Sequence, residues 1–247
     1  MASDRILAVT LARGGSKSVP NKNIRPIFGV PLLGYTIAEA KRSRYITRYL
    51  VSTDSEDIRR IAIRYEAEVP FLRPADLASD TASSVAALQH AVGWAEADEG
   101  QRYDYVVELM CTNPMKTVDD IDAAIDKLVS TGADSVIGMC RLADHHPIRI
   151  KKIVDDRIVD FALPETPESR RQDLKPDAYI RNGSIYALRR DVLMVQGRRY
   201  GTPHSRPHIM PLDRSINVDS PVDFVVAEAL FKAHPRPYVA RLADLEA

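Results

Sequence analysis

The sequence predicts an α/β protein with a Rossmann-like, mainly parallel sheet and helices on both faces. Two observations support this class. Short apolar runs alternate with segments of helical periodicity from the N-terminus to about Asp144, a pattern typical of parallel strands joined by helices. The first run, Ile6–Leu11, is apolar except for Thr10, as in strands that are buried on both faces. The fold class is therefore that of the doubly wound α/β proteins.

Further strands are expected at residues 49–52, 69–72, 105–110 and 135–139. Between them, apolar residues three and four positions apart predict helices, the first over residues 31–43. Thr53 and Glu56 form a capping-box pattern that predicts the start of the second helix. A third helix follows near Val85, and Thr117 with Asp120 is expected to cap a fourth.

The alternation stops near Asp144, and residues 144–206 are rich in Pro, Arg and charge. A hairpin is expected at residues 152–161, with its turn at Asp155 and Asp156, and a strand at residues 182–188 is expected to return to the main sheet. A last helix is predicted for Pro221–Ala233. We therefore expect one domain, residues 1–247, with an inserted arm or subdomain at residues 144–206.

Composition excludes several classes of protein. The 247 residues are 45% hydrophobic and carry 34 basic and 34 acidic side chains, so the chain is not disordered and has no excess charge for binding nucleic acid. No apolar run is long enough to span a membrane. The N-terminus lacks a secretory signal pattern, and Cys111 and Cys140 form no disulfide framework. We expect a cytoplasmic protein whose cysteines are small buried side chains.

The segment most informative about function follows the first strand and reads Leu11-Ala-Arg-Gly-Gly-Ser-Lys-Ser-Val-Pro-Asn-Lys-Asn23. Ligands of open α/β sheets bind beyond the carboxyl ends of the strands. Gly14 and Gly15 allow a close approach of the backbone to an anion, and Arg13, Lys17 and Lys22 supply positive charge. The spacing matches neither the dinucleotide nor the P-loop motif. The alternative is a solvated basic loop, but the position after the first strand favours phosphate binding.

This loop resembles the signature of the CMP-sialic acid synthetases, the acylneuraminate cytidylyltransferases. Further blocks resemble the family in the same order: Val51–Asp54, Phe71–Ser84, His145–Arg149, Arg170–Leu174, Asn182–Tyr186 and Ser215–Asp219. The resemblance implies a Mg²⁺-dependent enzyme that transfers CMP from CTP to a nine-carbon α-keto acid sugar and releases pyrophosphate. It also implies a homodimer in which an arm, carrying Arg170 and Arg171, completes the partner's site.

The resemblance assigns the nucleotide side as follows. Arg13, Lys17, Lys22 and Asp219 would be the catalytic residues, and the phosphates would lie on Arg13 and on the backbone from Gly14 to Lys17, which includes Gly15 and Ser16. Cytosine and ribose contacts would come from Asn23, Arg73, Ser83 and Ser84. Taken without the resemblance, Ser83 and Ser84 could equally cap a helix, and Arg73 could form a surface ion pair.

Asp219 is the main candidate ligand for Mg²⁺, because a carboxylate at a strand end can hold this ion against a triphosphate. It could also cap the helix that starts near Pro221. The family commonly has a second Asp where this chain has Asn217. Asn217 offers an oxygen ligand without charge, which makes a two-metal arrangement doubtful.

On the sugar side, the resemblance points to Arg149, Arg171, Asn182 and Tyr186. Arg149 could bind the substrate carboxylate, and Tyr186 could instead pack in the core. Residues 108–116 read Glu-Leu-Met-Cys-Thr-Asn-Pro-Met-Lys where the family often has L-L-Q-P-T-S-P-L-R. Met110 and Lys116 depart from that pattern, so the substrate need not be N-acetylneuraminic acid.

Three alternatives stay open. A CMP-Kdo synthetase-like enzyme would act on an eight-carbon acid, but its loop usually lacks the Gly14–Gly15 pair. An inactive nucleotide-binding relative is favoured only by Met110, Lys116 and Asn217. A sugar-1-phosphate nucleotidyltransferase shares the α/β plan but not the arm. For the main reading, the expected partners are CTP and a nonulosonic acid sugar as substrates, with no nucleic acid and no membrane.

Overall fold

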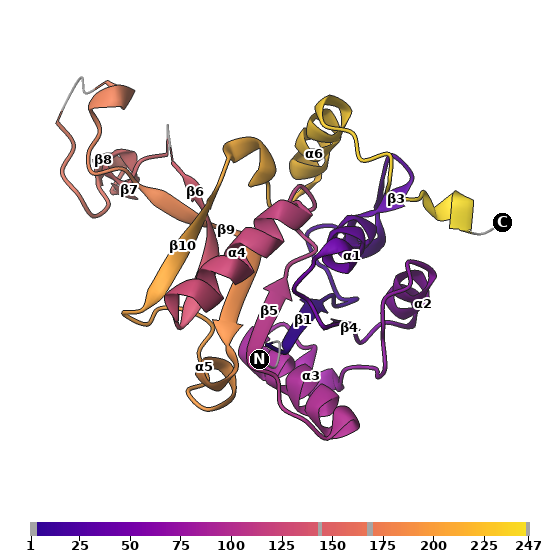
Figure 1. The fold of residues 1–247 in the computed structure, drawn as a ribbon. Coiled ribbons are helices and arrows are strands. Elements are labelled where there is room, and N and C mark those ends of the chain that lie inside the picture. Colours follow the sequence, from indigo (N-terminus) through magenta and orange to yellow (C-terminus); the bar gives the residue numbers. More distant parts are fainter. Residues whose placement is uncertain (1–3, 143–144, 167–169, 246–247) are drawn as a thin grey trace.

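The computed structural model describes residues 4–142, 145–166 and 170–245. Six strands form one sheet in the order β10-β6-β9-β5-β1-β4 (Figure 1). Their bounds are β1 Ile6–Leu11, β4 Arg48–Ser52, β5 Tyr105–Leu109, β6 Ser135–Arg141, β9 Tyr179–Arg189 and β10 Ser205–Met210. Only β9 runs antiparallel to its two neighbours in this sheet. The predicted mainly parallel sheet is confirmed.

Helices cover both faces of the sheet. On one face lie α3 (Ser84–Glu99) and α5 (Arg190–Met194), and on the other lie α1 (Leu32–Arg42), α2 (Glu56–Arg64), α4 (Val118–Thr131) and α6 (Pro221–Ala233). Strand β1 shows why an uninterrupted apolar run is needed. Its side chains alternate between the two cores, so that Leu7 and Val9 pack toward α3, and Ile6 and Ala8 toward α4.

The helix starts agree with the sequence in one case and differ in another. Thr117 and Asp120 form the expected capping box of α4. In α2, however, the N-cap is Ser55, whose Oγ accepts a hydrogen bond from the backbone of Ile58. Thr53 instead accepts from the backbone N–H of Ser55. The capping-box prediction at Thr53 was therefore wrong by two residues, since β4 is followed by a turn before the helix begins.

The expected strand at residues 69–72 is not a strand of the sheet. The segment makes only isolated bridges, from Glu68 to Leu50 and from Leu72 to Thr53. Pro70 lies between these bridges and has no N–H to donate to a ladder. Strand β10 was not predicted, because it is an edge strand that contains Pro207 and mostly exposed or half-buried side chains. Its pattern therefore lacks the apolar run of a buried strand.

The predicted hairpin is confirmed. Strands β7 (Lys151–Val154) and β8 (Arg157–Asp160) pair antiparallel, and the turn residues Asp155 and Asp156 have φ angles of 47° and 59°. The hairpin projects from the body of the molecule (Figure 1). Within residues 144–206, β9 and α5 belong to the main sheet and to the face covered by α3.

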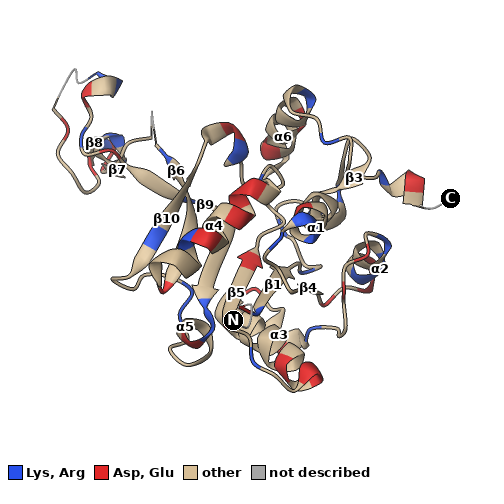
Figure 2. Ribbon diagram, viewed as in Figure 1, with Lys and Arg blue, Asp and Glu red and all other residues tan. Residues whose placement is uncertain are grey.

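The remaining elements are short. Strands β2 (Pro26–Ile27) and β3 (Val30–Pro31) form a small hairpin before α1. Basic and acidic residues are interspersed along the ribbon (Figure 2). None of the helices in the described ranges has the length and apolar character needed to cross a membrane.

Candidate active site

A cleft of about 510 Å³ lies beyond the carboxyl ends of β1 and β5, where ligands of open α/β sheets bind. It is polar and carries several charged groups. Of the predicted site residues, those that line the cleft are Arg13, Ser16, Lys17, Lys22, Asn23, Arg73, Ser83, Ser84 and Asp219. The fold therefore gathers, from four separate segments, most of the residues that the sequence assigned to the nucleotide.

The glycine-containing loop after β1 is held by neighbouring segments. The backbone N–H of Gly14 donates to Asp54 Oδ1 at 2.9 Å, and a Cβ on Gly14 would lie 3.0 Å from the Cβ of Ser55. Asn23 is buried and its amide donates to the carbonyl of Arg13 at 2.9 Å. Glycine is needed at position 14 because the end of β4 approaches the loop this closely. Asn23 thus supports the loop that presents Arg13.

Two cations of this loop converge on one carboxylate. Asp80 lies 2.8 Å from Arg13 Nη1 and 2.5 Å from Lys17 Nζ. Hydrogen bonds from Lys17 and Arg13 hold the pKa of Asp80 below its usual range. Because both cations reach the same pair of oxygen atoms, they can also reach one phosphate group. Asp80 was not among the predicted site residues, although it lies within the Phe71–Ser84 block.

Arg73 is the most strongly buried cation at this end of the cleft. Its Nε and Nη2 atoms have no hydrogen-bond partner in the described part of the chain, and Nη2 lies 3.8 Å from Asp54 Oδ1. Burial lowers the pKa of Arg73. An unsatisfied buried N–H is costly, so a bound ligand that accepts these hydrogen bonds would remove that cost. Arg73 does form the ion pair considered as an alternative, with Asp54, but its guanidinium is buried and not at the surface.

Ser83 and Ser84 lie at the start of α3. The Oγ of Ser83 accepts a hydrogen bond from the backbone of Val85, which makes Ser83 the N-cap. Both serines also line the cleft. The structural role and the predicted contact with a nucleotide are therefore compatible.

Asp219 lies at the opposite wall, beside Lys22. Lys22 Nζ is 2.6 Å from Asp219 Oδ1, and Asn217 donates to the other carboxylate oxygen. The carboxylate of Asp219 does not cap α6. The N-cap is Ser220, which forms a capping box with Asp223, and Asp219 contributes only its backbone N–H. The alternative capping role for the Asp219 side chain is thus wrong, and its carboxylate faces the cleft.

Asp219 and Asn217 carry oxygen atoms of the kind that Mg²⁺ takes, although the Asn217 amide here presents its nitrogen to the Asp219 carboxylate and would have to turn to act as a ligand. Asn217 Oδ1 is buried and has no hydrogen-bond partner in the described ranges. One carboxylate and one amide oxygen are hard ligands, and Mg²⁺ commonly takes one or two protein ligands together with substrate phosphates and water. Within the described residues, no group of three His, Cys, Asp or Glu side chains could hold a metal. An ion here would therefore depend on oxygen atoms of a bound ligand.

The residues predicted for the sugar side are not part of the cleft lining of the same chain. Asn182 is buried, and its amide donates to Ser215 Oγ at 3.0 Å. Tyr186 is buried at the end of the cleft near Glu108, its pairing partner on β5. Arg149 lies 3.8 Å from Glu165 in the arm. Arg171 lines a different cavity at the base of the arm, together with Cys140 and Met210.

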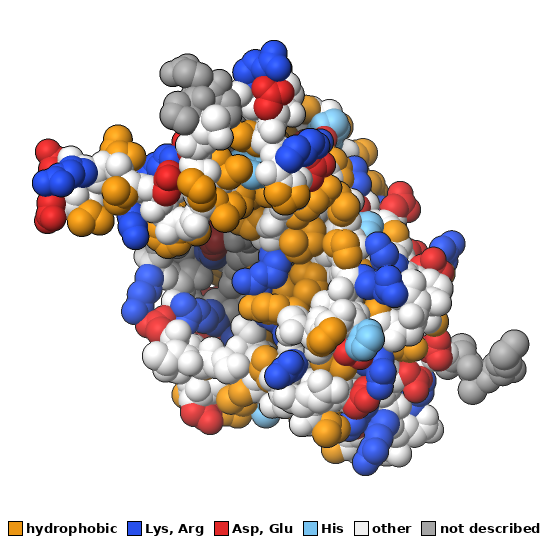
Figure 3. Space-filling model, turned by 90° about the vertical axis from the view of Figure 1, so that its left-hand side faces the viewer, with side chains coloured by type: hydrophobic (Ala, Val, Ile, Leu, Met, Phe, Trp, Pro, Cys, Tyr) orange, Lys and Arg blue, Asp and Glu red, His pale blue; other side chains and the backbone are white. Residues whose placement is uncertain are grey.

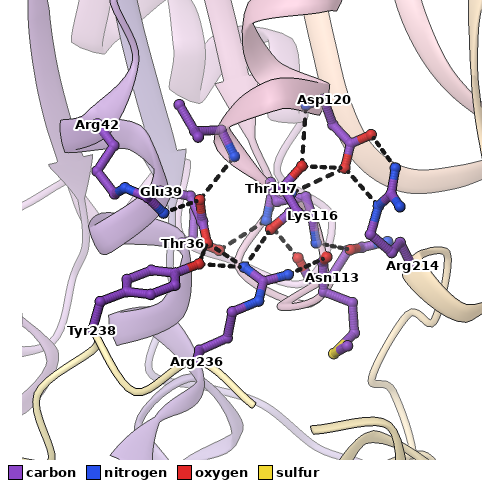
Figure 4. Close-up of polar contacts among 12 residues, drawn as sticks. Thr36, Glu39, Arg42, Asn113, Lys116, Thr117, Asp120, Arg214, Arg236 and Tyr238 are labelled. Carbon is purple, nitrogen blue, oxygen red and sulfur yellow. Dashed lines mark hydrogen bonds and ion pairs between the residues drawn. The ribbon is translucent and has the colours of Figure 1, made fainter. Parts of the chain in front are cut away.

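The two departures from the family pattern have different surroundings. Met110 lines the cleft. Lys116, by contrast, is completely buried behind it, in a polar network of α1, α4 and the segment after α6 (Figure 4). From the sequence, we expected Lys116 to alter the sugar pocket. The structure corrects this, because Lys116 does not line the cleft. Cys111 and Cys140 are buried and unbridged, as expected.

Lys116 ties the turn between β5 and α4 together. Its Nζ donates to Thr36 Oγ1 at 2.8 Å, to the carbonyl of Met110 at 2.8 Å and to that of Asn113 at 2.5 Å. An ammonium group has three N–H donors, and all three are used. The buried ammonium group of Lys116 therefore holds the turn that places Met110 in the cleft.

Charged groups surround this cation at a greater distance. Glu39 is buried and pairs with Arg236 and Tyr238, as the dashed lines of Figure 4 show. Burial is the main cause that lowers the pKa of Lys116 to about 7. Cys111 and Glu39 act in the opposite direction.

Two charged residues near the cleft escaped the sequence analysis. Glu108 lines the cleft and lies 2.5 Å from Arg199, which follows α5. An acidic residue inside the apolar run of β5 was a signal that could have drawn attention to Glu108. Nothing in the sequence around Arg199 indicates that it meets β5.

A cation-lined cleft at the carboxyl edge of a mainly parallel sheet defines a nucleotide-binding α/β protein. Comparison with known families makes this specific. The family model described as cytidylyltransferase matches residues 7–230. The chain therefore belongs to the cytidylyltransferase family.

Characterised relatives cover nearly the whole chain. It is 33% identical over 227 residues to post-translational flagellin modification protein B of Campylobacter coli, with 92% of this chain and 95% of the relative covered. It is 30% identical to the CMP-N,N'-diacetyllegionaminic acid synthase of Legionella pneumophila (95% and 100% covered). It is 29% identical to the pseudaminic acid cytidylyltransferase of Campylobacter jejuni (92% and 97% covered).

Solved structures agree with the fold. A CMP:2-keto-3-deoxy-manno-octonic acid synthetase complexed with CTP superimposes with a TM-score of 0.69 at 18% identity, covering 94% of this chain and 100% of that one. A 4-diphosphocytidyl-2C-methyl-D-erythritol synthase from Anaerococcus prevotii gives a TM-score of 0.63 at 14% identity, covering 93% and 97%. At these identities the likeness shows the fold alone.

Lys116 should make the stability of the protein depend on pH. With a pKa of about 7 in the folded state and 10.5 as the ordinary value, the unfolded chain holds one more proton between these pH values, so stability rises with pH there. Between pH 7 and 9 this contributes about 2 kcal/mol to the free energy of unfolding. Urea unfolding should show the rise in the wild type and its loss in Lys116→Met.

Lys127→Met is the matched control. Lys127 lies on α4, where its amino group donates to the carbonyl of Pro207 at the surface. This variant should keep the wild-type increase in stability. An equal increase in Lys116→Met would show that the pH dependence has another source.

Proposed function

We propose that the protein transfers CMP from CTP to the anomeric hydroxyl of a nine-carbon α-keto acid sugar and releases pyrophosphate. The observation that carries this proposal is the cleft itself, in which buried Arg73, beside the basic loop of Arg13 and Lys17, has N–H groups that find no partner among the described residues. The names of the relatives support the choice of nucleotide and of sugar class. The enzyme would work in the cytoplasm, where CTP is available.

The charges of the cleft suit a nucleoside triphosphate. Arg13, Lys17, Lys22 and Arg73 line it, and in the free protein Asp80 and Asp219 compensate three of these cations. A triphosphate would take over the cations by displacing the two carboxylates. Such ion pairs are partly exposed, so each contributes little to stability and the exchange is cheap.

The reaction needs no covalent nucleophile on the protein. The sugar hydroxyl attacks the α-phosphorus of CTP, a new P–O bond forms, and the bond to the β-phosphate oxygen breaks, so that pyrophosphate leaves. The hydroxyl proton passes to solvent or to a nearby base. Catalysis then consists of positioning and of neutralising the charge that builds up on pyrophosphate. We assign the neutralisation of the charge on pyrophosphate to Arg13, Lys17 and Lys22.

Mg²⁺ fits this scheme through Asp219 and Asn217. When bound, it would supply charge neutralisation at the phosphates and lower the pKa of a coordinated hydroxyl. Lys22 now pairs with Asp219 and would have to release it to a metal, after which its ammonium group could turn to the phosphates. With one carboxylate and one amide as protein ligands, we propose a single ion.

The sugar acid is a nonulosonic acid. The relatives named above are a legionaminic acid synthase and a pseudaminic acid cytidylyltransferase, and Met110 replaces the glutamine common in synthetases for sialic acid. The eight-carbon alternative is supported by likeness of fold only.

Pyrophosphate release tests the function. Purified protein with Mg²⁺ should release it with CTP and one of N-acetylneuraminic, N,N'-diacetyllegionaminic or pseudaminic acid, and not with ATP, GTP or UTP. Release with 2-keto-3-deoxy-manno-octonic acid instead would point to the eight-carbon alternative. Silence with every acid, while CTP still binds, would identify an inactive relative.

Arg73 provides the control within the same assay. Arg73→Gln should raise the KM for CTP about tenfold or more, because it removes charged hydrogen-bond donors. Arg60→Gln, on the exposed surface of α2 where Arg60 pairs with Asp57, should leave it unchanged. If both variants match the wild type, Arg73 does not contact the nucleotide.

Asp219→Asn tests the metal site. Removing the only carboxylate of the pair should raise the Mg²⁺ concentration needed for half-maximal activity about tenfold or more. Binding of Mn²⁺ to the CTP complex, followed by electron paramagnetic resonance, should weaken in parallel. Asp213→Asn is the control, because Asp213 is a half-buried carboxylate on the same segment that pairs with His234 and does not line the cleft. An unaltered metal titration in Asp219→Asn would place the ion elsewhere.

We also propose a homodimer built on the arm. Ile153 and Ile158 are paired across the hairpin and are 68% and 74% exposed. Figure 3 shows hydrophobic side chains gathered on the projecting part and on the surface next to it. Val222 and Val225 of α6, which starts beside the cleft, are also exposed. A second copy would cover these surfaces, and its Arg170 and Arg171 would then come from the partner to the sugar end of the cleft.

Charge in the hairpin should separate the two copies. The Ile153→Glu and Ile158→Glu double variant should sediment as a single chain of 27.6 kDa, whereas the wild type should sediment as two. Val195→Glu, at an exposed apolar residue after α5, should remain dimeric. A monomeric wild type would end the proposal of a dimer and would leave the nucleotide site unaffected.

A further inference from the structure

The cleft has two ends, which belong to different strands. Arg13 follows β1, and Arg73 lies beside the end of β4, where its backbone N–H donates to the carbonyl of Thr53. Glu108 and Met110 lie at the end of β5, next to β9. In the proposed reaction the nucleotide occupies the first end. The sugar acid is left with the second, so the side chains there decide which acid fits.

Glu108 lines the second end and forms a largely buried ion pair with Arg199, which is not itself one of the lining residues. Glu108 Oε2 accepts a hydrogen bond from Arg199 Nη1 at 2.5 Å, across 91 residues of sequence. The side chains of Glu108 and Arg199 are 3% and 15% exposed. Burial raises the pKa of Glu108, and Arg199 opposes this shift. In the described part of the chain, Arg199 is the one cation paired with Glu108.

Aromatic rings hold the guanidinium in place. Arg199 lies over the ring of Tyr186, 4.2 Å from its centroid, and 5.7 Å from that of Tyr200. Tyr186 is the pairing partner of Glu108 in the β5–β9 ladder, so both side chains stand on the same face of the sheet. The pair is therefore rigidly oriented before any ligand binds, as a selective subsite requires.

We propose that Glu108 and Arg199 form a hydroxyl-binding subsite for the sugar acid and so determine its specificity; this rests on the proposed function. A single hydroxyl oxygen can donate its hydrogen to the Glu108 carboxylate while accepting one from an N–H of Arg199. The pair has no net charge, so it does not attract the carboxylate of the sugar. A methyl or methylene group in the same place would bury the pair without any hydrogen bond in return, which is costly.

The test combines a protein variant with altered substrates. The Glu108→Gln and Arg199→Gln double variant keeps the pair neutral. With the nine-carbon acid that the wild type uses, its KM for the acid should rise about tenfold or more, while its KM for CTP stays within about twofold. A set of analogues of that acid, each lacking one hydroxyl, is then measured with both proteins. For one analogue, kcat/KM should fall about tenfold or more relative to the parent acid with the wild type, and should change little with the variant.

Glu96→Gln with Arg190→Gln is the matched control. This pair is buried to a similar degree, with contacts of 2.6 and 2.8 Å between α3 and α5, but neither of its residues lines the cleft, whereas Glu108 does. It should leave both KM values unchanged. If the double variant does not fold, the analogues still test the inference with the wild type alone. A wild type whose KM is the same for the parent acid and for every analogue overturns the inference.

The outcomes separate the two proposals. A wild type that releases no pyrophosphate with any acid means that the proposed function is wrong, and the subsite falls with it. If the wild type is active and the double variant has a changed KM for CTP, or has both KM values unchanged, the subsite is wrong and the proposed function stands. The subsite is supported if kcat/KM falls for the analogue lacking one particular hydroxyl with the wild type and does not fall for it with the variant.

Discussion

A strand that is buried on both faces can present polar atoms to a ligand only at its ends, and the site depends on this constraint. In β1, Leu7 and Val9 are committed to one core, and Ile6 and Ala8 to the other. Thr10 is buried and donates to the carbonyl of Leu109, so polar groups become available to a ligand only at the loop that follows Leu11. Since β4 and β5 are parallel to β1, the segments after all three strands meet at one edge. That meeting point is the cleft.

The backbone at this edge is held by polar side chains from neighbouring segments. Asp54 accepts from the backbone of Gly14, Asn23 donates to the carbonyl of Arg13, and Lys116 supports the carbonyls of the turn after β5. Each is a group that would be costly to bury without partners. Several polar residues next to the cleft thus serve the backbone, and the backbone in turn positions the residues that face the ligand.

The two ends of the cleft differ in their chemistry. At the β1 end, cations are compensated by exposed carboxylates that an anionic ligand can displace. At the β5 end, Glu108 and Arg199 compensate each other in a buried pair stacked on Tyr186. The first arrangement suits a polyphosphate, and the second suits a neutral polar group. This division matches a transfer reaction between a charged donor and a hydroxylated acceptor.

The sequence by itself determined the alternation of strands and helices, the phosphate-type loop after β1 and the family, because these are written in local periodicity and in contiguous motifs. Only the tertiary structure decided that Lys116 lies behind the cleft and that Arg199 reaches Glu108. Edge strand β10 also escaped prediction, since Pro207 and its exposed side chains leave no apolar pattern. Such features depend on contacts between residues far apart in the chain. A local sequence pattern does not predict which distant residue a long side chain contacts.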